Sequence, residues 1–382
     1  MIVESVKLDQ FRNYKSLELE FDSGTNLFYG DNAQGKTNVL EAVYLCGTTR
    51  SHRAGKDREM IRFGQEEAHI CMRIRKGDVP YRIDMHLKKN RSKGIAINGS
   101  PVRKASELVG LGNFVFFSPE DLNIIKNGPA ERRRFLDMEL CQLDRIYLYQ
   151  LSNYNKLLVQ RNRLLKDYAG YPEAEAMLDI MDEQLLQYGT VIIEARERFV
   201  RELGGIIGRI HGNLSGNREV LEVTYEKDTQ ISQFAARLKQ NRERDIRSKM
   251  TNCGPHRDDL CFAIREVDIR RFGSQGQQRT AALSLKLAEI EIVKQSVKDT
   301  PVLLLDDVLS ELDSRRQRYL LESIHDIQTM ITGTGVDDFV ENNFKINRLF
   351  QVTDGTVSQK NSQEVFHERR VRCRSDPDTG RT

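Results

Sequence analysis

Apolar and polar residues alternate over positions 2–8 and again over 16–21. Alternation with a period of two indicates half-buried β-strands, so these two runs predict a hairpin. The segment between them, Phe11-Arg12-Asn13-Tyr14, places an arginine at a polar turn. A short apolar strand is predicted at 26–29, followed by a glycine-rich loop. An amphipathic helix is then indicated by Val39, Leu40, Val43 and Tyr44.

The pattern changes twice along the rest of the chain. Residues 68–75, 80–88 and 95–98 predict a small antiparallel sheet with a turn at Asn98-Gly99. From Pro129 to about 213 the apolar residues recur with a helical period. One strand is then indicated at 219–226, and helix resumes to about 250. Further strands are predicted at 260–264, 267–269, 302–305 and 330–332.

This order of elements predicts an α/β domain that is interrupted by a mainly helical insertion. We assign residues 1–126 together with 251–357 to the α/β domain and residues 127–250 to the inserted helical domain. Residues 358–382 are polar and are expected to form a flexible tail.

Composition places the chain among charge-rich globular proteins, with 39% hydrophobic and 30% charged residues in 382. No apolar run approaches the roughly 18 residues that a membrane-spanning helix needs. The first residues alternate like a strand and lack the apolar core of a signal peptide. Six cysteines are scattered without a CxxC pair. We therefore expect a cytoplasmic protein with reduced thiols and no membrane partner.

The glycine-rich loop carries the first chemical signal. Gly30-Asp31-Asn32-Ala33-Gln34-Gly35-Lys36-Thr37 fits the pattern GxxxxGK[ST], and Asn38 follows it. In such a loop the backbone N–H groups surround a phosphate, the lysine reaches the β- and γ-phosphates, and the threonine binds Mg²⁺. The helix that begins behind the loop adds the positive end of its dipole. We therefore predict that residues 30–38 bind ATP and that Thr37 is a Mg²⁺ ligand.

A second signal lies near residue 306. Pro301 is followed by the apolar run Val302 to Leu305, which ends in the carboxylates Asp306 and Asp307. A continuous apolar run is typical of a strand that is buried on both faces. Asp306 at its end is the second predicted Mg²⁺ ligand, and Asp307 is predicted to polarise the attacking water.

A third signal is Ser274-Gln275-Gly276-Gln277, directly before a helix. One interpretation is a simple helix cap. In a protein with a phosphate-binding loop, we favour a second interpretation, in which the serine hydroxyl, the backbone N–H groups and the helix dipole act on a γ-phosphate.

The order of these segments resembles that of the ABC ATPases: phosphate loop, Ser-x-Gly-Gln signature, acidic strand, and then Ser310 to Asp313 as the D-loop. In that family the signature of one subunit closes on the ATP of another. The resemblance therefore implies an ATP-dependent homodimer, in which Ser274, Gly276 and Gln277 complete the partner's site and Lys36, Ser274 and Asp307 are catalytic.

Other segments are similar to the RecF family of bacterial recombination mediators, and they occur at 11–14, 30–38, 117–122, 254–260, 306–307 and 310–313. The resemblance implies an SMC/Rad50-like head acting in DNA replication and recombinational repair, where it helps to load recombinase at gaps. It also implies weak DNA-stimulated ATP hydrolysis and binding to double-stranded DNA and to single/double-strand junctions. RecR, and through it RecO, are the implied protein partners.

The resemblance extends to single residues. Arg12 corresponds to a residue that contacts nucleotide phosphates. Glu120 lies near the position of a Q-loop glutamine, although an acid cannot mimic an amide donor. Asp307 stands where many ABC ATPases have glutamate, and the shorter side chain suggests slow hydrolysis. Thr332 occupies the neighbourhood of the absent switch histidine.

Basic residues form four clusters, although the net charge is only +3. Each cluster alone is compatible with a solvated face, but together they favour a shared polyanion-binding surface. The clusters lie at 50–58, 88–93, 132–134 and 237–249.

The sequence has three alternative interpretations of function. The nucleotide-binding subunit of an ABC transporter is disfavoured by the absent switch histidine, the hairpin with Arg12 and the basic clusters. A complete SMC or Rad50 protein would need hundreds of coiled-coil residues where this chain has an insertion of about 120. A scaffold that binds ATP but hardly hydrolyses it differs from the favoured function only in rate.

Overall fold

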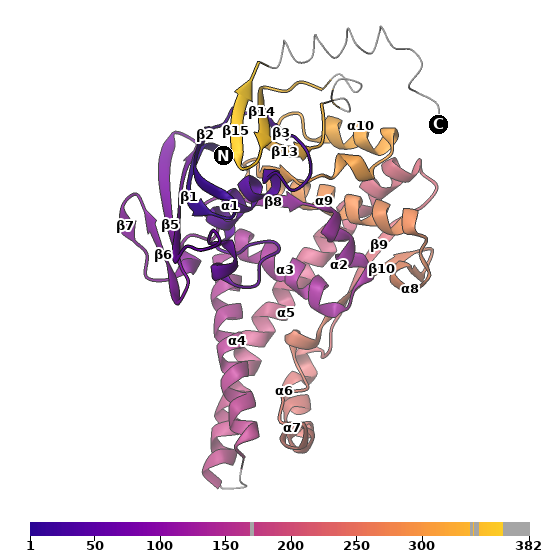
Figure 1. Cartoon of the computed structure of the whole chain (residues 1–382). Helices are drawn as coiled ribbons and strands as arrows, with labels where there is room; N and C mark the ends of the chain where they lie inside the picture. The colour runs from indigo at the N-terminus through magenta and orange to yellow at the C-terminus, as the bar shows by residue number, and fades with distance from the viewer. Residues whose placement is uncertain (169–171, 337–338, 340–343, 362–382) are drawn as a thin grey trace. The chain divides into compact units, whose positions relative to one another are not determined.

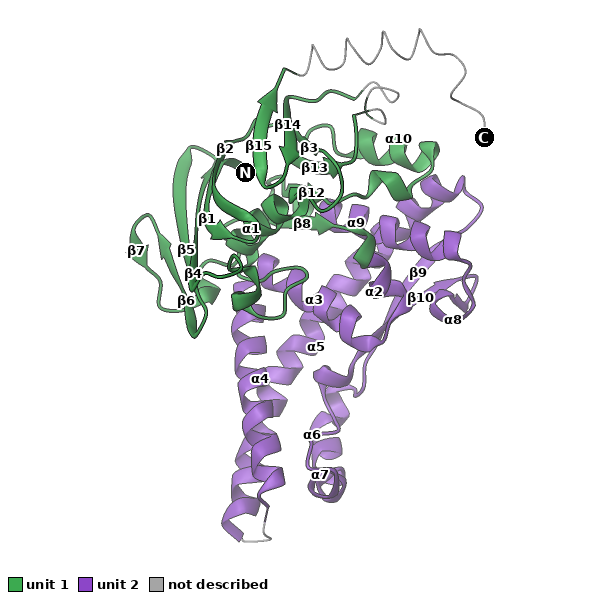
Figure 2. Cartoon of the chain, in the orientation of Figure 1, with its two compact units in different colours: residues 1–120, 293–382 green, residues 121–292 purple. Residues whose placement is uncertain are grey.

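The computed structural model describes residues 1–168, 172–336, 339 and 344–361. They form two compact units, one of residues 1–120 with 293–382 and the other of residues 121–292 (Figures 1 and 2).

Unit 1 contains an antiparallel sheet with the strand order β2-β1-β4-β5-β6-β7. Phe11 lies opposite Tyr14 in the predicted hairpin β1–β2. Val3, Val6 and Leu8 are all buried, although Val3 breaks the two-residue period, because the β1–β4 register shifts between Val3 and Ser5. The strands are β1 (Ile2–Phe11), β2 (Tyr14–Glu20), β4 (Glu67–Lys76), β5 (Val79–Lys88), β6 (Arg91–Ile97) and β7 (Ser100–Pro101).

The second sheet of unit 1 has the order β15-β14-β3-β13-β12-β8, and only β15 runs antiparallel to its neighbour. Its strands are β3 (Thr25–Tyr29), β8 (Phe114–Phe117), β12 (Val302–Leu305), β13 (Thr329–Gly333), β14 (Arg348–Thr353) and β15 (Thr356–Lys360). Strands β8 and β12 are buried along their whole length, as the apolar sequence of a parallel strand requires. The sequence pattern does not predict β8, β14 or β15, because short runs show no decisive period.

The longer helices of unit 1 are α1 (Lys36–Thr48) and α10 (Ser314–Ser323). Short 3₁₀ turns lie in the connections between the described elements of this unit. They are η1 (Asp57–Met60), η2 (Ala105–Glu107), η3 (Pro119–Asp121, the last residue of which falls in unit 2) and η5 (Leu309–Glu311).

Unit 2 is mainly helical, and its long helices α4 and α5 run side by side (Figure 1). The helices are α2 (Leu122–Lys126), α3 (Pro129–Leu143), α4 (Arg145–Lys166), α5 (Pro172–Ser215), α6 (Ile231–Gln240), α7 (Arg242–Ser248), α8 (Ile269–Phe272) and most of α9 (Gln275–Val297). A small sheet has the order β11-β10-β9, with β9 (Leu221–Glu226), β10 (Asp259–Ile264) and β11 (Val267–Asp268). The 3₁₀ turn η4 (Pro255–Arg257) precedes β10.

The compact units divide at 120/121 and 292/293, whereas the sequence predicts domain boundaries at 126/127 and 250/251. Residues 251–292 join the helical unit because β10 pairs with β9 along its whole length and α3 packs against β10. The sequence-based boundaries therefore stay a prediction. Of the expected flexible tail, residues 358–360 lie in β15, and residues 362–382 lie outside the described part of the chain. Within the described residues no helix is both long and apolar enough to span a bilayer.

Candidate nucleotide-binding site

The parallel sheet brings three chain segments together at one edge. Strand β13 lies between β3 and β12, with Gly333 beside Tyr29 and Ile331 beside Leu305. The carboxyl ends of neighbouring parallel strands meet at one edge of the sheet, where α/β proteins bind their ligands. This edge therefore carries the glycine-rich loop after β3, Thr332 of β13, and Asp306 after β12.

Two glycines of the loop are required by their conformation and surroundings. Gly30 has φ +151°, and a Cβ added there would lie 2.3 Å from the carbonyl oxygen of Val352. Gly35 has φ +111°, and its Cβ would lie 2.5 Å from the side chain of Asn13. Any other side chain at these two positions would be both strained and obstructed.

Neighbouring turns hold the loop in place. The carbonyl oxygen of Gln34 accepts from Asn13 Nδ2 at 3.0 Å and from the Gly355 N–H at 3.3 Å. The Tyr14 hydroxyl donates to the Gly35 carbonyl oxygen at 3.0 Å. The β1–β2 turn and the β14–β15 turn thus hold the loop from two sides.

A cavity of about 280 Å³ lies over the loop. Lys36 is 4% exposed, and its Nζ donates to the carbonyl oxygens of Gly30 at 2.7 Å and of Asp31 at 3.0 Å. The ammonium group is therefore held across the loop, where an anion can meet it. The cavity is lined by Asn32, Ala33, Gln34, Gly35, Lys36, Thr37, Asn38, Arg53 and Asp307. Eight of these nine residues are predicted site residues, and Arg53 is not.

Hydrogen bonds connect the two predicted metal ligands. Thr37 Oγ1 donates to Asp306 Oδ1 at 2.7 Å, and Thr332 Oγ1 donates to the same oxygen at 2.9 Å. Burial raises the pKa of Asp306 against the opposing effect of these two hydrogen bonds, and the charge of Asp307 adds to the rise. A cation at this position would offset the unfavourable burial of the carboxylate.

The residues present fit Mg²⁺. This ion prefers oxygen ligands and takes only one or two from protein side chains, with water and phosphate supplying the others. The Thr37 hydroxyl and the Asp306 carboxylate meet this need. Among the described residues no cluster of three or more His, Cys, Asp and Glu side chains could hold a metal by itself.

Thr332 has a defined position in this network. Its hydroxyl donates to Asp306, and it accepts from the backbone N–H of Asp307 at 2.9 Å. Asp307 has φ +51°, a left-handed conformation that is uncommon for a residue other than glycine. Thr332 therefore orients the carboxylate of Asp306 and holds the backbone of Asp307.

A buried acid that sequence analysis missed lies beside the site. Glu41 of α1 is fully buried and accepts from Arg12 through Nε at 2.8 Å and Nη2 at 2.7 Å. It also accepts from Arg53 Nη2 at 3.0 Å and from Ser51 Oγ at 2.5 Å. Burial alone would raise the pKa of Glu41, but these hydrogen bonds outweigh it and lower the pKa to about 2. The signal in the sequence was a single acid within the apolar run of a predicted helix.

Not every predicted residue lies at the cavity. Arg12 lines an adjoining cavity, and its guanidinium is held by Glu41. Glu120 in η3 is exposed and does not line the nucleotide cavity. Ser274, Gly276 and Gln277 belong to unit 2, at the start of α9. There Gln277 N–H donates to Ser274 Oγ at 3.2 Å and Ser274 N–H donates to Gln277 Oε1 at 2.8 Å, which is a reciprocal helix cap.

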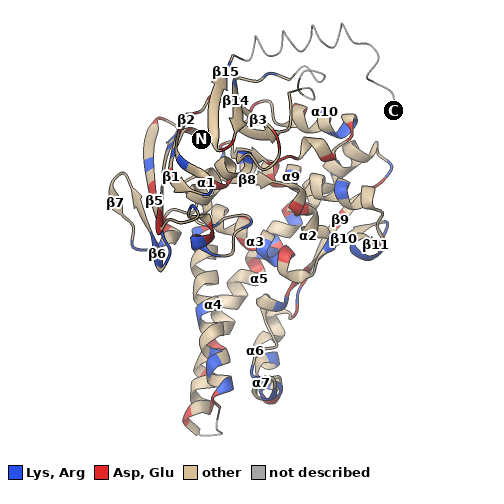
Figure 3. Ribbon diagram, in the orientation of Figure 1, with Lys and Arg blue, Asp and Glu red and all other residues tan. Residues whose placement is uncertain are grey.

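Several members of the basic clusters have structural partners. Arg132 is 1% exposed and pairs with Asp259, and Arg242 pairs with Asp179 and Asp182. Lys93 donates to the Thr49 carbonyl oxygen and to Asp57, so the clusters at 50–58 and 88–93 lie side by side in unit 1. Charged residues occur along the ribbons of both units (Figure 3). The four clusters are thus only partly available for a ligand.

The fold and the site together define a P-loop ATPase head of the ABC type: a parallel strand, a glycine-rich loop and a helix beside a strand that ends in two carboxylates. Comparison with known proteins narrows this class. Residues 2–358 match the family described as RecF/RecN/SMC N terminal domain. A DNA replication and repair protein RecF of Lachnospira eligens is 58% identical over 363 residues, which cover 94% of this chain and 100% of that protein.

Solved structures support the same family. The structure of the recombination mediator protein RecF-ATP in the RecFOR pathway superposes with a TM-score of 0.88 and 37% identity, covering 94% of this chain and 97% of that one. An Smc head domain from Pyrococcus furiosus shares the fold, with a TM-score of 0.56, 16% identity and coverage of 97% and 99%. The chain therefore belongs to the RecF/RecN/SMC N-terminal domain family and, within it, to the RecF proteins of DNA replication and repair.

This result confirms the predicted fold class, an α/β ABC-type, SMC-like ATPase head with a mainly helical insertion. It also favours the predicted role in DNA replication and repair over the nucleotide-binding subunit of an ABC transporter.

Proposed function

We propose that this chain binds ATP and Mg²⁺ at the unit 1 site, dimerises around the nucleotide on double-stranded DNA, and separates after slow hydrolysis. The observation that carries the proposal is the hydrogen-bonded series Thr37–Asp306–Thr332–Asp307 beside the phosphate loop. It gives one pair of oxygens for a cation, Thr37 Oγ1 and Asp306 Oδ1, beside the carboxylate of Asp307, which lines the cavity.

Each residue then has a role. The N–H groups of residues 30–38 and the Lys36 ammonium bind the phosphates, while Thr37 and Asp306 hold Mg²⁺, which neutralises phosphate charge when bound. Asp307 lines the cavity and orients the attacking water. Its carboxylate is one methylene shorter than the glutamate at this position in many ABC ATPases, so hydrolysis is slow.

The signature segment supports a site that a second copy completes. Gly276 lies in the first turn of α9, yet a Cβ there would meet only Ser274 Oγ, at 3.9 Å. Among the described residues no close neighbour requires a glycine at this position. An ATP phosphate held by a second copy would require it, because close approach to the N–H groups leaves no room for a side chain. Ser274 and Gly276 are both exposed, as such a contact needs.

DNA is the proposed polyanion. The exposed part of the basic clusters is suited to phosphate contacts, and the RecF relatives act in DNA replication and repair. We include single/double-strand junctions among the DNA ligands and stimulation of hydrolysis by DNA. A RecF structure described as part of the RecFOR pathway supports RecR and RecO as partners in the cytoplasm.

Sedimentation of three variants tests the composite site. Ser274→Arg should bind ATP normally and stay monomeric, because a bulky cation replaces a small donor at the junction. Asp307→Asn should accumulate ATP-bound dimers, because it keeps the cation ligands but loses the carboxylate that polarises water. Lys36→Ala is the control that should bind no ATP and form no dimer. If Ser274→Arg dimerises with ATP, or if Asp307→Asn dimerises without it, the composite site is wrong.

Salt dependence tests the DNA surface. Each neutralised phosphate releases counterions, so duplex affinity should fall steeply with salt and should not depend on base sequence. Binding isotherms at about 50 and 200 mM salt should differ by at least tenfold for a surface with several phosphate contacts. Equal affinity at both salt concentrations would contradict a surface that binds phosphates.

A further inference from the structure

The side chain of Gln277, in the signature segment of unit 2, has two partners of opposite chemical character (Figure 2). Its Oε1 accepts from the Ser274 N–H at 2.8 Å, and its Nε2 donates to Glu219 Oε1 at 2.8 Å. A backbone N–H can only donate, and an ionised carboxylate can only accept. The two partners therefore fix which end of the amide faces Ser274 and which end faces Glu219.

Glu219 lies between α5 and β9, in a turn that the end of α5 holds in place. The Asn217 N–H donates to the Gly212 carbonyl oxygen at 2.7 Å, which closes the last turn of the helix. The Glu219 N–H donates to Ser215 Oγ at 3.3 Å. The Glu219 side chain is 27% exposed, so it is only partly solvated. The turn after α5 therefore places a carboxylate beside the signature segment.

A buried histidine lies behind the other oxygen of this carboxylate. His211 of α5 is fully buried, and its Nε2 lies 3.6 Å from Glu219 Oε2. The Ser284 hydroxyl donates its one proton to the Thr280 carbonyl oxygen at 2.7 Å, so it accepts from His211 Nδ1 at 3.1 Å. The Glu219 carboxylate thus lies between the imidazole of His211 and the amide of Gln277.

This arrangement exceeds what a helix cap requires. The bond from Gln277 N–H to Ser274 Oγ, at 3.2 Å, and the return bond to the Ser274 N–H already form a reciprocal cap. Glu219 is not part of that local motif, since it lies 58 residues before Gln277 in the chain. The additional bond from Glu219 fixes the amide that in turn holds both polar groups of the exposed Ser274.

We propose that Glu219 is a positioning residue of the composite site: it holds the Gln277 amide, and Gln277 holds Ser274 in the orientation that meets the ATP of a second copy. The proposal rests on the proposed function and deepens it, because donors that are fixed in advance stabilise charge best. Gln277 then acts through Ser274 of its own copy and does not touch the nucleotide. Glu219 itself lies outside the phosphate cavity.

Dimerisation gives the first test. Glu219→Ala removes the acceptor of Gln277 Nε2, so the signature segment must be ordered each time a dimer forms. Sedimentation should show ATP-dependent dimerisation of the full chain weakened about tenfold, as for the loss of one hydrogen bond to a charged group. The affinity of the monomer for ATP should stay within about twofold of wild type, because unit 1 holds the phosphate loop. Glu219→Gln keeps an acceptor oxygen and should dimerise within about threefold of wild type.

Hydrogen exchange gives a second test that needs neither ATP nor a dimer. In Glu219→Ala the Ser274 amide of the free monomer should exchange about threefold faster or more, since its acceptor is no longer held. The denaturation midpoint should be unchanged, which separates a loss of position from a loss of fold. Glu222→Ala is the matched control, because Glu222 is an exposed acid of β9 in the same unit. It should change neither exchange at Ser274 nor dimerisation.

Three outcomes would overturn the proposal. Wild-type dimerisation in Glu219→Ala would show that the signature segment needs no support from Glu219. An equal loss in Glu219→Gln would assign the effect to the negative charge and not to the acceptor. Weaker ATP binding by the Glu219→Ala monomer would assign Glu219 to the nucleotide itself. A wild-type protein that does not dimerise with ATP would instead overturn the proposed function, and exchange at Ser274 would still decide whether Glu219 positions the segment.

Discussion

Two arginine–carboxylate networks of this molecule differ in which group is in excess, the arginines or the carboxylates. In unit 1 one buried acid, Glu41, serves Arg12 and Arg53, whose side chains are 21% and 34% exposed. In unit 2 acids are in excess: Arg161 is fully buried between Asp182 and Asp245, and Arg242 pairs with Asp182 and Asp179. An excess of arginine leaves positive charge for an outside anion, whereas an arginine enclosed by acids can only bind parts of its own chain. The ratio of arginines to carboxylates therefore distinguishes a cluster that can bind an anion from a cluster that only stabilises the fold.

The unit 2 network should show the largest effect on stability. Arg161→Met leaves the buried Asp245 carboxylate without the ion pair that it forms with Arg161, while Asp182 keeps Arg242. Breaking a buried pair in this way lowers the free energy of unfolding by about 3–5 kcal/mol. Denaturant titration measures the loss. Arg209→Met is the control, because Arg209 is 56% exposed where it pairs with Glu291, and such pairs contribute less than about 1 kcal/mol. Equal losses in the free energy of unfolding of the two variants would show that the buried network contributes no more to stability than the exposed pair.

The unit 1 network should make the free energy of unfolding depend on pH in the acid range. The pKa of Glu41 is about 2 in the folded protein against an ordinary value of 4.5. Because the folded value is depressed, its contribution is fully present above about pH 4.5 and is lost as the pH falls towards 2. This contribution is about 3 kcal/mol in the free energy of unfolding. Glu41→Gln should lack this part of the acid sensitivity, and parallel pH curves for both proteins would contradict the assignment.

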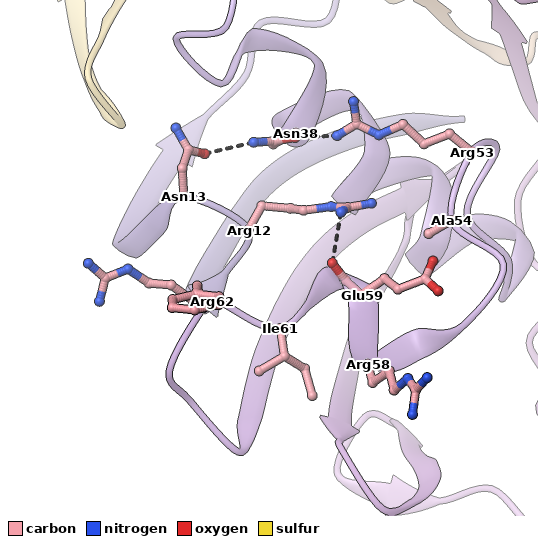
Figure 4. Close-up of a pocket in the computed structure, with 10 residues that line it drawn as sticks. Arg12, Asn13, Asn38, Arg53, Ala54, Arg58, Glu59, Ile61 and Arg62 are labelled. Atoms are coloured by element: carbon pink, nitrogen blue, oxygen red, sulfur yellow. Dashed lines mark hydrogen bonds between the residues drawn. The ribbon is translucent and has the colours of Figure 1, made fainter.

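The smallest predicted effect concerns Arg53, which lines both the nucleotide cavity and the adjoining cavity of Arg12 (Figure 4). Arg53→Gln should lower ATP affinity by about tenfold, or about 1.4 kcal/mol, by removing one positive charge near the phosphates. The free energy of unfolding should change by less than about 1 kcal/mol, because Arg12 still pairs with Glu41. Calorimetric titration and denaturation on the same variant check both values. A large loss of stability with normal ATP affinity would place Arg53 among the structural arginines.

The sequence predicted those parts of the site that are local in the chain. The loop at 30–37 carries its spacing within eight residues, and the strand that ends at Asp306 carries its apolar run. The Thr332 contacts were out of reach, because they depend on β13 lying between β3 and β12. The roles of Glu41 and Arg53 depend on the fold of the β1–β2 turn over α1, which no periodicity encodes.

The partners of the basic clusters also could not be predicted from the sequence. Arg132 and Arg242 look like surface charges in the sequence, but Asp259 and Asp182 neutralise them in the structure. A count of charges along the sequence does not reveal ion-pair partners that lie more than 50 residues away in the chain. The segment at 254–260 is another example: it carried the family resemblance, and in the structure its Asp258 pairs with the buried Arg196.

The turn between β14 and β15 has a consequence for the synthesis of this protein. The Gly355 N–H donates to the carbonyl oxygen of Gln34, and the Asp354 N–H donates to its side chain. The phosphate loop thus receives supports from a turn that lies 320 residues later in the chain. Until the ribosome has released that turn the loop lacks one of its two braces, so a nascent or truncated chain carries the full nucleotide motif without the finished nucleotide site.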